Sequence, residues 1–282
     1  MQASEIKKIL EENNISVKKQ YGQNFLMDDN IIKKICDISN IDKETNVIEI
    51  GPGLGFLTKE LSQRAKQVLC YEVDGDMIKI LTNKFSSSNV IIKYQDFLKA
   101  NIDEDIKKIF SSDNVIVVAN LPYYITTAIL TKILNESKYI KQLTVMMQEE
   151  VAQRICGTPS TKDYNALSVL IQYYTNTTNA IKVPSSVFFP APKVDSSVVL
   201  IKKKDTITNK VLDEKYFKTF IYTIFAQRRK TLINNLKKLP KFDYEKTSEI
   251  FNELNIDLSV RAEKLSVDEI VNLTNKFYLS QN

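Results

Sequence analysis

The feature that most restricts the fold is a glycine-rich turn between a strand pattern and a helix pattern. The run NVIEI at residues 46–50 leads directly into GPGLG at residues 51–55, and helical periodicity continues to residue 64. Glycine adopts positive φ easily and lets a ligand approach the backbone closely. The turn therefore predicts a ligand site at the carboxyl end of a strand, where open α/β sheets bind their ligands.

Short runs rich in β-branched residues alternate with helical patterns along the first part of the chain. The strand patterns lie at residues 46–50, 67–73, 90–94, 115–119 and 143–147, and the helical patterns lie at 54–64, 75–85 and 126–134. This alternation predicts a parallel sheet with crossover helices, which is an α/β fold of the Rossmann-like type. A further strand pattern at residues 194–203 is expected to close the sheet antiparallel.

The pattern changes near residue 204. Apolar residues then recur at three- and four-residue spacing over residues 216–225, and amphipathic segments continue to Tyr278. This periodicity predicts a small all-helical C-terminal domain. We therefore predict two domains, residues 1–204 and residues 205–282. The turn-rich segment 156–163 is the best candidate for a mobile loop.

Positive charge is concentrated in the predicted helical domain. The chain has a net charge of +5, and all of the excess lies after residue 201. Residues 215–241 contain eight basic residues and no acidic one. A basic helical face is commonly just solvated, but charge of one sign over such a length favours a polyanionic partner such as a nucleic acid.

Composition disfavours several kinds of chemistry. The chain has no histidine, and its three cysteines, Cys36, Cys70 and Cys156, lack CxxC spacing. Histidine-based catalysis, zinc sites and a disulfide framework are therefore not expected, and we predict no metal. No apolar stretch is long enough to span a bilayer, and residues 1–19 contain no signal-peptide core. We expect a cytoplasmic protein that does not contact a membrane.

Two carboxylates help to choose a cofactor. The GxGxG spacing differs from the GxGxxG of NAD sites and lacks the GK[ST] ending of a phosphate-binding loop. Glu72 ends the second strand pattern, where a carboxylate can accept hydrogen bonds from the ribose of NAD or of S-adenosylmethionine. Asp96 ends the third pattern and could accept a bond from an adenine amino group. As isolated carboxylates both would more often be surface residues, and only their strand-end positions favour binding.

The motif NLPYY at residues 120–124 follows the fourth strand pattern. The side-chain oxygen of Asn120 and the carbonyl of Leu121 can accept both N–H groups of adenine, which favours a nitrogen lone pair directed at a methyl sulfonium. Pro122 stiffens the loop, and Tyr123 can stack on an extruded base. Taken alone, the pentapeptide would fit an ordinary turn with two half-buried tyrosines.

Five motifs together resemble one known family from about residue 18 to the C-terminus. The chain is similar to the small-subunit rRNA adenine dimethyltransferases of the KsgA type in the motifs KQYGQNFL at residues 19–26, EIGPGLG at 49–55, NLPYY at 120–124, FFPAPKVDS at 188–196 and FAQRRKTL at 225–232. The resemblance implies a class I S-adenosylmethionine methyltransferase domain followed by a helical rRNA-binding domain. It implies dimethylation of N6 of two adjacent adenosines near the 3′ end of 16S rRNA in the 30S particle.

The resemblance also assigns roles to residues. It implies cofactor contacts by Asn24, Leu26, Gly51, Glu72, Asp96 and Asn120, with the segment that contains Asn24 folded over the cofactor as a lid. It implies catalytic roles for Asn120, Leu121, Pro122 and Tyr123, and a second stacking surface at Phe188. In this picture Arg228, Arg229 and Lys230 contact rRNA phosphates. We expect a monomer.

Three alternatives remain open at this point. A 23S rRNA adenine methyltransferase of the macrolide-resistance type shares the glycine loop and the Asn-Leu/Ile-Pro-Tyr loop, but the motifs at 188–196 and 225–232 favour the small-subunit enzyme. A ribosome-assembly or transcription factor that has lost catalysis is disfavoured by the intact site residues. An NAD-dependent oxidoreductase is disfavoured by the GxGxG spacing and the absence of histidine.

Overall fold

The chain folds into two compact units. The computed structural model describes residues 3–110, 113–240 and 242–281. One unit comprises Met1–Ala152 with Thr177–Lys203, and the other comprises Gln153–Asn176 with Lys204–Asn282. The change of pattern near residue 204 coincides with the last crossing between the units. Residues 153–176 belong to the second unit, although the expected boundary puts them in the first domain. The sequence did not indicate this, because apolar periodicity does not tell which core a helix joins.

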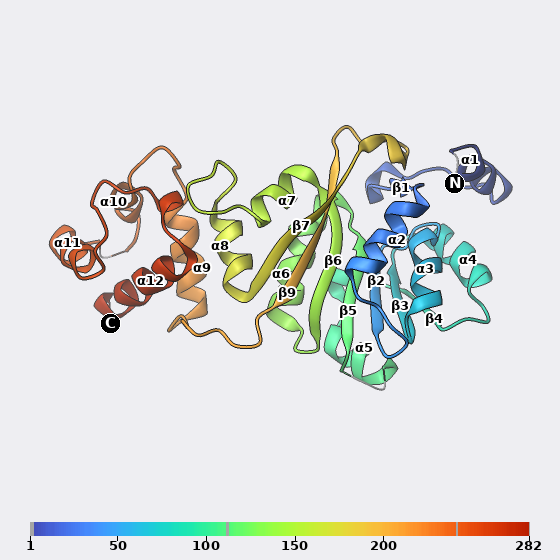
Figure 1. Cartoon of the computed structure of the whole chain (residues 1–282), viewed down its shortest axis with the longest axis horizontal. Helices are drawn as coiled ribbons and strands as arrows, with labels where there is room; N and C mark the ends of the chain where they lie inside the picture. Colours follow the sequence, from blue (N-terminus) through green and yellow to red (C-terminus); the bar gives the residue numbers. More distant parts are fainter. Residues whose placement is uncertain (1–2, 111–112, 241, 282) are drawn as a thin grey trace. The chain divides into compact units, whose positions relative to one another are not determined.

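The first unit is built on a seven-stranded sheet with the order β4-β3-β2-β5-β6-β9-β7 (Figure 1). Its strands are β2 (Asn46–Ile50), β3 (Gln67–Glu72), β4 (Val90–Tyr94), β5 (Val115–Asn120), β6 (Ile140–Gln148), β7 (Thr175–Val183) and β9 (Ser196–Lys203). Strands β2 to β6 pair in parallel, and β9 runs antiparallel to β6. The predicted Rossmann-like α/β class and the antiparallel closing strand are confirmed.

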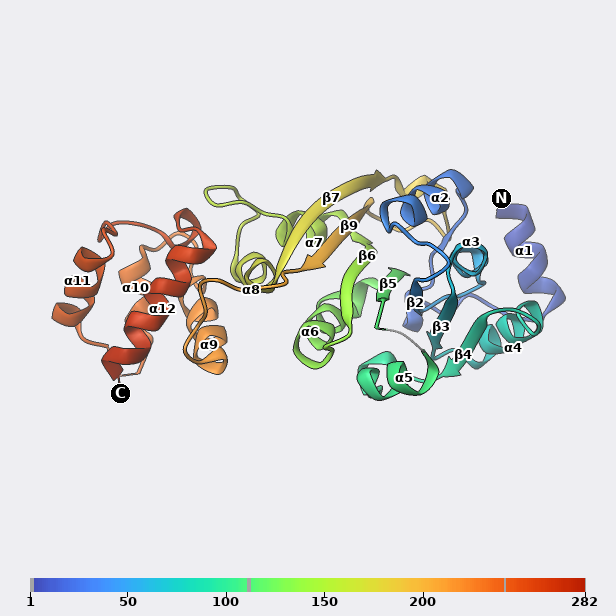
Figure 2. The same cartoon turned by 60° about the horizontal axis from the view of Figure 1, so that its bottom comes forward.

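Helices cover both faces of this sheet, which explains why β2 and β3 are buried along most of their length. The helices of this unit are α1 (Ala3–Glu12), α2 (Asp29–Ile38), α3 (Phe56–Arg64), α4 (Gly75–Lys84), α5 (Ile102–Ile109) and α6 (Thr126–Glu136), and α7 (Glu149–Ile155) begins in this unit and ends in the other. Apolar side chains of α2, α3 and α4 share one core, and α5 and α6 lie on the opposite face (Figure 2).

The order of the strands reverses beside β2. The chain passes outward from β2 through β3 to β4 and then returns to β5 on the other side of β2. Ligands of open α/β sheets bind at the carboxyl ends of the strands at such a reversal. A second, two-stranded sheet joins β1 (Phe25–Leu26) to β8 (Phe188–Phe189) and ties the N-terminal segment to the same unit.

The second unit is helical, as its periodicity predicts. It contains α8 (Ala166–Tyr174), α9 (Glu214–Ile224), α10 (Leu232–Leu236), α11 (Tyr244–Glu253) and α12 (Val267–Gln281). Phe217, Phe220, Ile221 and Ile224 form one buried stripe of α9 in a core shared with α12.

Short 3-10 turns occur along the chain at η1 (Lys19–Tyr21), η2 (Phe97–Lys99), η3 (Tyr123–Ile125), η4 (Ser185–Val187) and η5 (Ala262–Lys264).

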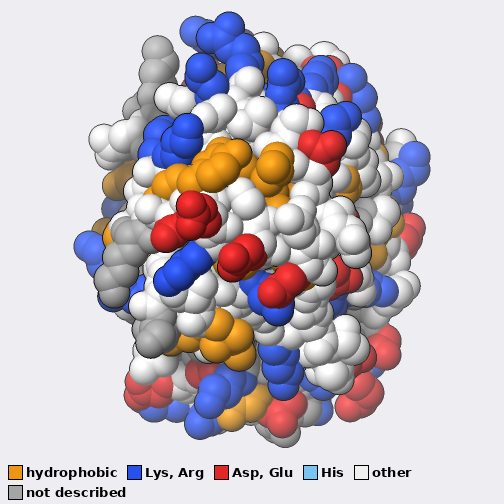
Figure 3. All heavy atoms as spheres, turned by 90° about the vertical axis from the view of Figure 1, so that its left-hand side faces the viewer, with side chains coloured by type: hydrophobic (Ala, Val, Ile, Leu, Met, Phe, Trp, Pro, Cys, Tyr) orange, Lys and Arg blue, Asp and Glu red, His pale blue; other side chains and the backbone are white. Residues whose placement is uncertain are grey.

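Charge is unevenly spread over the face drawn in Figure 3. In this view Lys and Arg side chains are most frequent toward the upper edge, acidic side chains lie across the middle, and side chains of both signs are mixed along the lower edge. Of the eight basic residues at positions 215–241, Lys241 lies outside the described residues. Throughout the described part of the chain, no helix has the length and apolar character that crossing a bilayer requires.

Candidate active site

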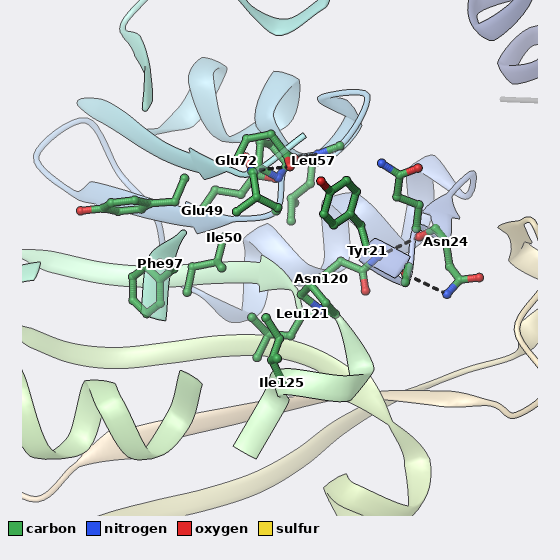
Figure 4. A pocket seen from close by; sticks show the side chains of 18 of the residues that line it. Tyr21, Asn24, Glu49, Ile50, Leu57, Glu72, Phe97, Asn120, Leu121 and Ile125 are labelled. Atoms are coloured by element: carbon green, nitrogen blue, oxygen red, sulfur yellow. Dashed lines mark hydrogen bonds between the residues drawn. The ribbon is translucent and has the colours of Figure 1, made fainter. Parts of the chain in front are cut away.

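A cavity of about 410 Å³ opens at the carboxyl edge of the sheet, where the strand order reverses (Figure 4). Most of its wall is made by the N-terminal segment around residues 21–26, the glycine loop after β2, and the segments at the ends of β3, β4 and β5. The residues involved are Ile35 of α2 and those in the ranges 21–26, 49–54, 56–57, 71–73, 95–98 and 120–125. The structure therefore brings together the N-terminal, glycine-loop and NLPYY motifs, which lie far apart in the sequence.

The glycine loop needs its glycines for close packing. Gly53 and Gly55 have φ of 56° and 74°, values that side-chain-bearing residues rarely adopt. A Cβ on Gly55 would lie 2.8 Å from the side chains of Leu81 and Phe85, and one on Gly53 would lie 3.0 Å from Phe25. The loop can thus pass between α4 and the N-terminal segment only with glycine at these positions.

Glu72 is fixed at the cavity wall by the backbone around it. Its buried carboxylate accepts hydrogen bonds from the N–H groups of Gly53 at 3.2 Å, Val73 at 2.8 Å and Asp74 at 2.9 Å. Burial raises the pKa of Glu72, while these three N–H groups oppose the rise. The carboxylate therefore links the end of β3 to the glycine loop, in the position where we expected a ribose to bind.

Asp96 follows β4 and retains a free acceptor. One of its carboxylate oxygens accepts the N–H of Leu98 at 2.9 Å and caps η2. The other oxygen has no hydrogen-bond partner among the described residues. Beside it the wall is aromatic, because the rings of Tyr71 and Phe97 meet edge to face with centroids 5.2 Å apart. An apolar wall with one free carboxylate oxygen fits a purine that carries an amino group.

Glu49 also lines the cavity, and the sequence pattern did not single it out as a site residue. It lies fully inside β2, and burial raises its pKa to about 7. The Cys70 thiol donates a hydrogen bond to it at 3.6 Å. The available signal was an acidic residue between Ile48 and Ile50 in a mostly apolar strand that ends at a glycine turn, because a carboxylate in such a strand is expected to be buried.

The NLPYY loop meets the N-terminal segment directly. The side-chain N–H of Asn120 donates to the carbonyl oxygen of Asn24 at 3.1 Å, and the amide of Asn24 donates to the carbonyl of Gly22 at 3.1 Å. The side-chain oxygen of Asn120 accepts no hydrogen bond from a described residue. Figure 4 shows Asn24 and Asn120 on neighbouring parts of the wall. Asn120 is therefore held in place by its nitrogen and keeps its oxygen as an acceptor.

The two tyrosines of this loop have different surroundings. The hydroxyl of Tyr123 shares a hydrogen bond of 2.7 Å with Ser196 Oγ at the start of β9, and burial raises the pKa of Tyr123. Tyr124 is 61% exposed, borders the cavity and lies over Gly22, where an added Cβ would be 3.5 Å from its ring. Leu121 and Pro122 line the cavity beside them.

Leu26 and Phe188 face each other across the short β1–β8 pair. Leu26 lines the cavity, whereas Phe188 is 2% exposed, packs in the core of the first unit and is not among the lining residues. The structure does not bring Phe188 to the cavity wall, since its ring is packed among the core side chains of the first unit. The stacking role expected of Phe188 stays a prediction.

The three basic residues expected to bind RNA lie after α9 in the second unit. Arg228 is engaged within the protein: its guanidinium pairs with Glu263 at 2.6 Å and donates to the carbonyl oxygens of Lys162 at 2.6 Å and Thr161 at 3.2 Å. Arg229 and Lys230 are exposed, and their side chains form no ion pair with a described residue. Their RNA contacts stay a prediction.

Comparison with known proteins agrees with this geometry. Residues 14–278 match the family model described as ribosomal RNA adenine dimethylase. The chain is 44% identical to a Bacillus cytotoxicus protein named ribosomal RNA small subunit methyltransferase A, over 95% of this chain and 94% of that one. The protein of the same name from a Geobacillus species is also 44% identical, with the same coverage of each chain.

Solved structures share the fold. The dimethyladenosine transferase from Plasmodium falciparum has a TM-score of 0.76 at 23% identity and covers 91% of this chain and 98% of its own. The 23S rRNA methyltransferase ErmE has a TM-score of 0.69 at 24% identity and covers 90% of this chain and 99% of its own. Because the family model matches residues 14–278, which is nearly the whole chain, the chain belongs to the ribosomal RNA adenine dimethylase family of S-adenosylmethionine-dependent methyltransferases.

Proposed function

We propose that the chain dimethylates N6 of two adjacent adenosines in the 3′-terminal hairpin loop of 16S rRNA, within the 30S particle, during small-subunit biogenesis. The observation that carries this proposal is Asn120, which is anchored through its nitrogen to Asn24 and keeps a free acceptor oxygen at the cavity. The names of the relatives, ribosomal RNA small subunit methyltransferase A, support the choice of the small subunit.

The residues of the NLPYY loop account for amino-group chemistry without histidine. The Asn120 oxygen and the Leu121 carbonyl accept the two N–H groups of adenine, so the nitrogen lone pair is freed from the ring. Pro122 stiffens the loop, and Tyr123 provides an aromatic surface for the base. S-adenosylmethionine, when bound, supplies an electrophilic methyl group on a sulfonium.

The cavity wall offers matching groups for that cofactor. We assign the ribose hydroxyls to Glu72 and the adenine amino group to the free oxygen of Asp96. Gly51 permits close approach of the methionine part, and Asn24 and Leu26 form the opposite wall. The assignment requires no metal ion.

The second unit supplies the expected contact with the RNA backbone. We assign phosphate contacts to Arg229 and Lys230, because both are exposed and unpaired among the described residues. Arg228 joins them in the same basic turn, with part of its hydrogen-bonding capacity used inside the protein. Phosphate contacts orient the enzyme, while RNA shape and the base pocket select the adenosines. We propose that the protein acts as a monomer in the cytoplasm.

A second candidate is methylation of 23S rRNA, the activity named for the solved structure ErmE, whose fold covers most of this chain. The higher identity to relatives named for the small subunit favours 16S rRNA.

Transfer of labelled methyl groups to purified ribosomal particles separates the two. Unmethylated 30S particles and protein-free 23S rRNA are incubated separately with the chain and labelled S-adenosylmethionine. We expect incorporation into 16S rRNA of the 30S particles, because we assign the selection of the adenosines to RNA shape together with the base pocket. Label found in 23S rRNA alone would overturn the proposal in favour of the second candidate.

A further inference from the structure

A compact set of ion pairs and hydrogen bonds joins the N-terminal segment to the loop between β3 and α4. The Lys18 ammonium lies between two carboxylates, 2.6 Å from Asp74 Oδ1 and 2.7 Å from Asp76 Oδ2. Gln23 donates from its amide nitrogen to Asp74 Oδ2 at 2.8 Å and accepts the backbone N–H of Lys18 at 2.8 Å. We call Lys18, Gln23 and Asp74 the Asp74 clasp.

The clasp differs from an ordinary surface ion pair because its carboxylate is buried. The Asp74 side chain is 0% exposed, although Lys18 is 31% exposed. Both of its oxygens are used, Oδ1 by Lys18 and the Asp76 N–H, and Oδ2 by Gln23. Removing one partner of a buried charge leaves that charge poorly compensated, whereas exposed pairs contribute little. Lys18 and Gln23 therefore stabilise the arrangement in which their segment covers Asp74.

The clasp connects two parts of the cavity wall: Gln23 lines the cavity itself, whereas Lys18 and Asp74 lie outside the lining. On the sheet side, the Asp74 N–H donates to the carboxylate of Glu72 at 2.9 Å. On the other side, the Lys18 ammonium lies 5.9 Å from the centroid of the Tyr21 ring, and Tyr21 to Leu26 line the cavity. The same contacts thus position both the ribose-binding carboxylate and the segment opposite it.

We propose that Lys18 and Gln23 are positioning residues for the cofactor: through Asp74 they hold residues 18–26 against the cavity, and cofactor affinity depends on this hold. The proposal rests on the S-adenosylmethionine site assigned above. A ligand that contacts the covered arrangement binds more weakly when that arrangement is less populated, in proportion to the lost population. Chemistry at Asn120, once the cofactor is bound, should change much less.

Arg64 provides a control in the same unit: a cation about as exposed as Lys18, paired with carboxylates that are less buried than Asp74. Its guanidinium also lies between two carboxylates, 2.5 Å from Asp37 and 2.7 Å from Glu60, and its side chain is 28% exposed. None of these three residues lines the cavity. Arg64→Met therefore removes a comparable cation and reports how much of any effect comes from general destabilisation.

The experiment measures the affinity of the full chain for S-adenosylhomocysteine by calorimetry, and the KM and kcat for methylation of 30S particles. Lys18→Met is expected to weaken binding by about tenfold, with a parallel rise in the KM for S-adenosylmethionine and kcat within about twofold of wild type. Gln23→Met should shift affinity in the same direction. Because Gln23 also lines the cavity, Lys18→Met is the decisive variant, and Lys18→Gln provides the measurement if Lys18→Met does not fold. Lys18→Arg should restore most of the affinity, because the cation remains.

Two results would overturn the clasp proposal. One is S-adenosylhomocysteine binding by Lys18→Met and Gln23→Met that equals wild type. The other is an equal loss of affinity in Arg64→Met, which would show that lower stability alone is responsible. Failure of the wild-type chain to bind S-adenosylhomocysteine would instead remove the cofactor assignment itself, so the two failures are distinguishable.

Discussion

Single buried polar atoms control the geometry of the site. Glu72 and Asn120 could be assigned from the sequence, because each ends a strand pattern at the edge where ligands bind. Their partners could not. The bond of Asn120 to Asn24 and the bond of Tyr123 to Ser196 join positions separated by more than seventy residues, and no local pattern records such pairs.

Ser196 offers a direct test of positioning at this scale. Ser196 and Ser197 are both buried, but they point to opposite faces of β9, and only Ser196 bonds the Tyr123 hydroxyl. Ser196→Ala removes the partner of a largely buried hydroxyl, which costs about 1 kcal/mol and lets the ring shift. We expect methyl transfer to 30S particles to slow by about fivefold, with unchanged affinity for S-adenosylhomocysteine.

Ser197→Ala is the control for that variant, and it should transfer methyl groups at the wild-type rate. Equal slowing by both changes would mean that β9 is merely destabilised, and the positioning role of Ser196 would be abandoned.

At the level of elements, periodicity predicted those strands and helices that bury one consistent face. The apolar runs of β2, β3 and β5 and the stripe of α9 are examples. β7 was not predicted, because it lies at the edge of the sheet and its middle is polar and largely exposed. The two-residue strands β1 and β8 also escaped prediction, since they exist only by pairing with each other.

Arg228 shows that an exposed basic residue can stabilise the local structure as well as bind a partner. It ties the segment after α9 to Glu263 and to the loop at residues 156–163. Arg228→Ala should lower the stability to urea by about 1 kcal/mol, because charged hydrogen bonds are lost at a partly exposed site. Arg229→Ala should leave the stability unchanged. It should reduce the slope of the logarithm of the 30S binding constant against the logarithm of the salt concentration by about one, the value for one phosphate contact.

Urea unfolding and 30S binding at several salt concentrations check both statements. Loss of stability in Arg229→Ala but not in Arg228→Ala would contradict the assignment of the two side chains.

For the whole molecule, the sequence predicted the α/β unit, the helical unit and the chemistry at one edge of the sheet. It did so because several motifs converge on that edge, and no single motif was sufficient. The grouping of residues 153–176 with the helical unit could not be predicted, since that choice depends on which core their apolar side chains meet. The uneven charge favours an RNA partner but does not identify it.

The most direct test of the central claim is analysis by mass spectrometry of nucleosides from 16S rRNA after reaction with wild type and with Asn120→Ala. Wild type should produce N6,N6-dimethyladenosine in unmethylated 30S particles. Asn120→Ala should bind the particles nearly as well but produce it at least about a hundredfold more slowly, because the free acceptor at the cavity is lost. Dimethyladenosine formed by Asn120→Ala at the wild-type rate would contradict the account.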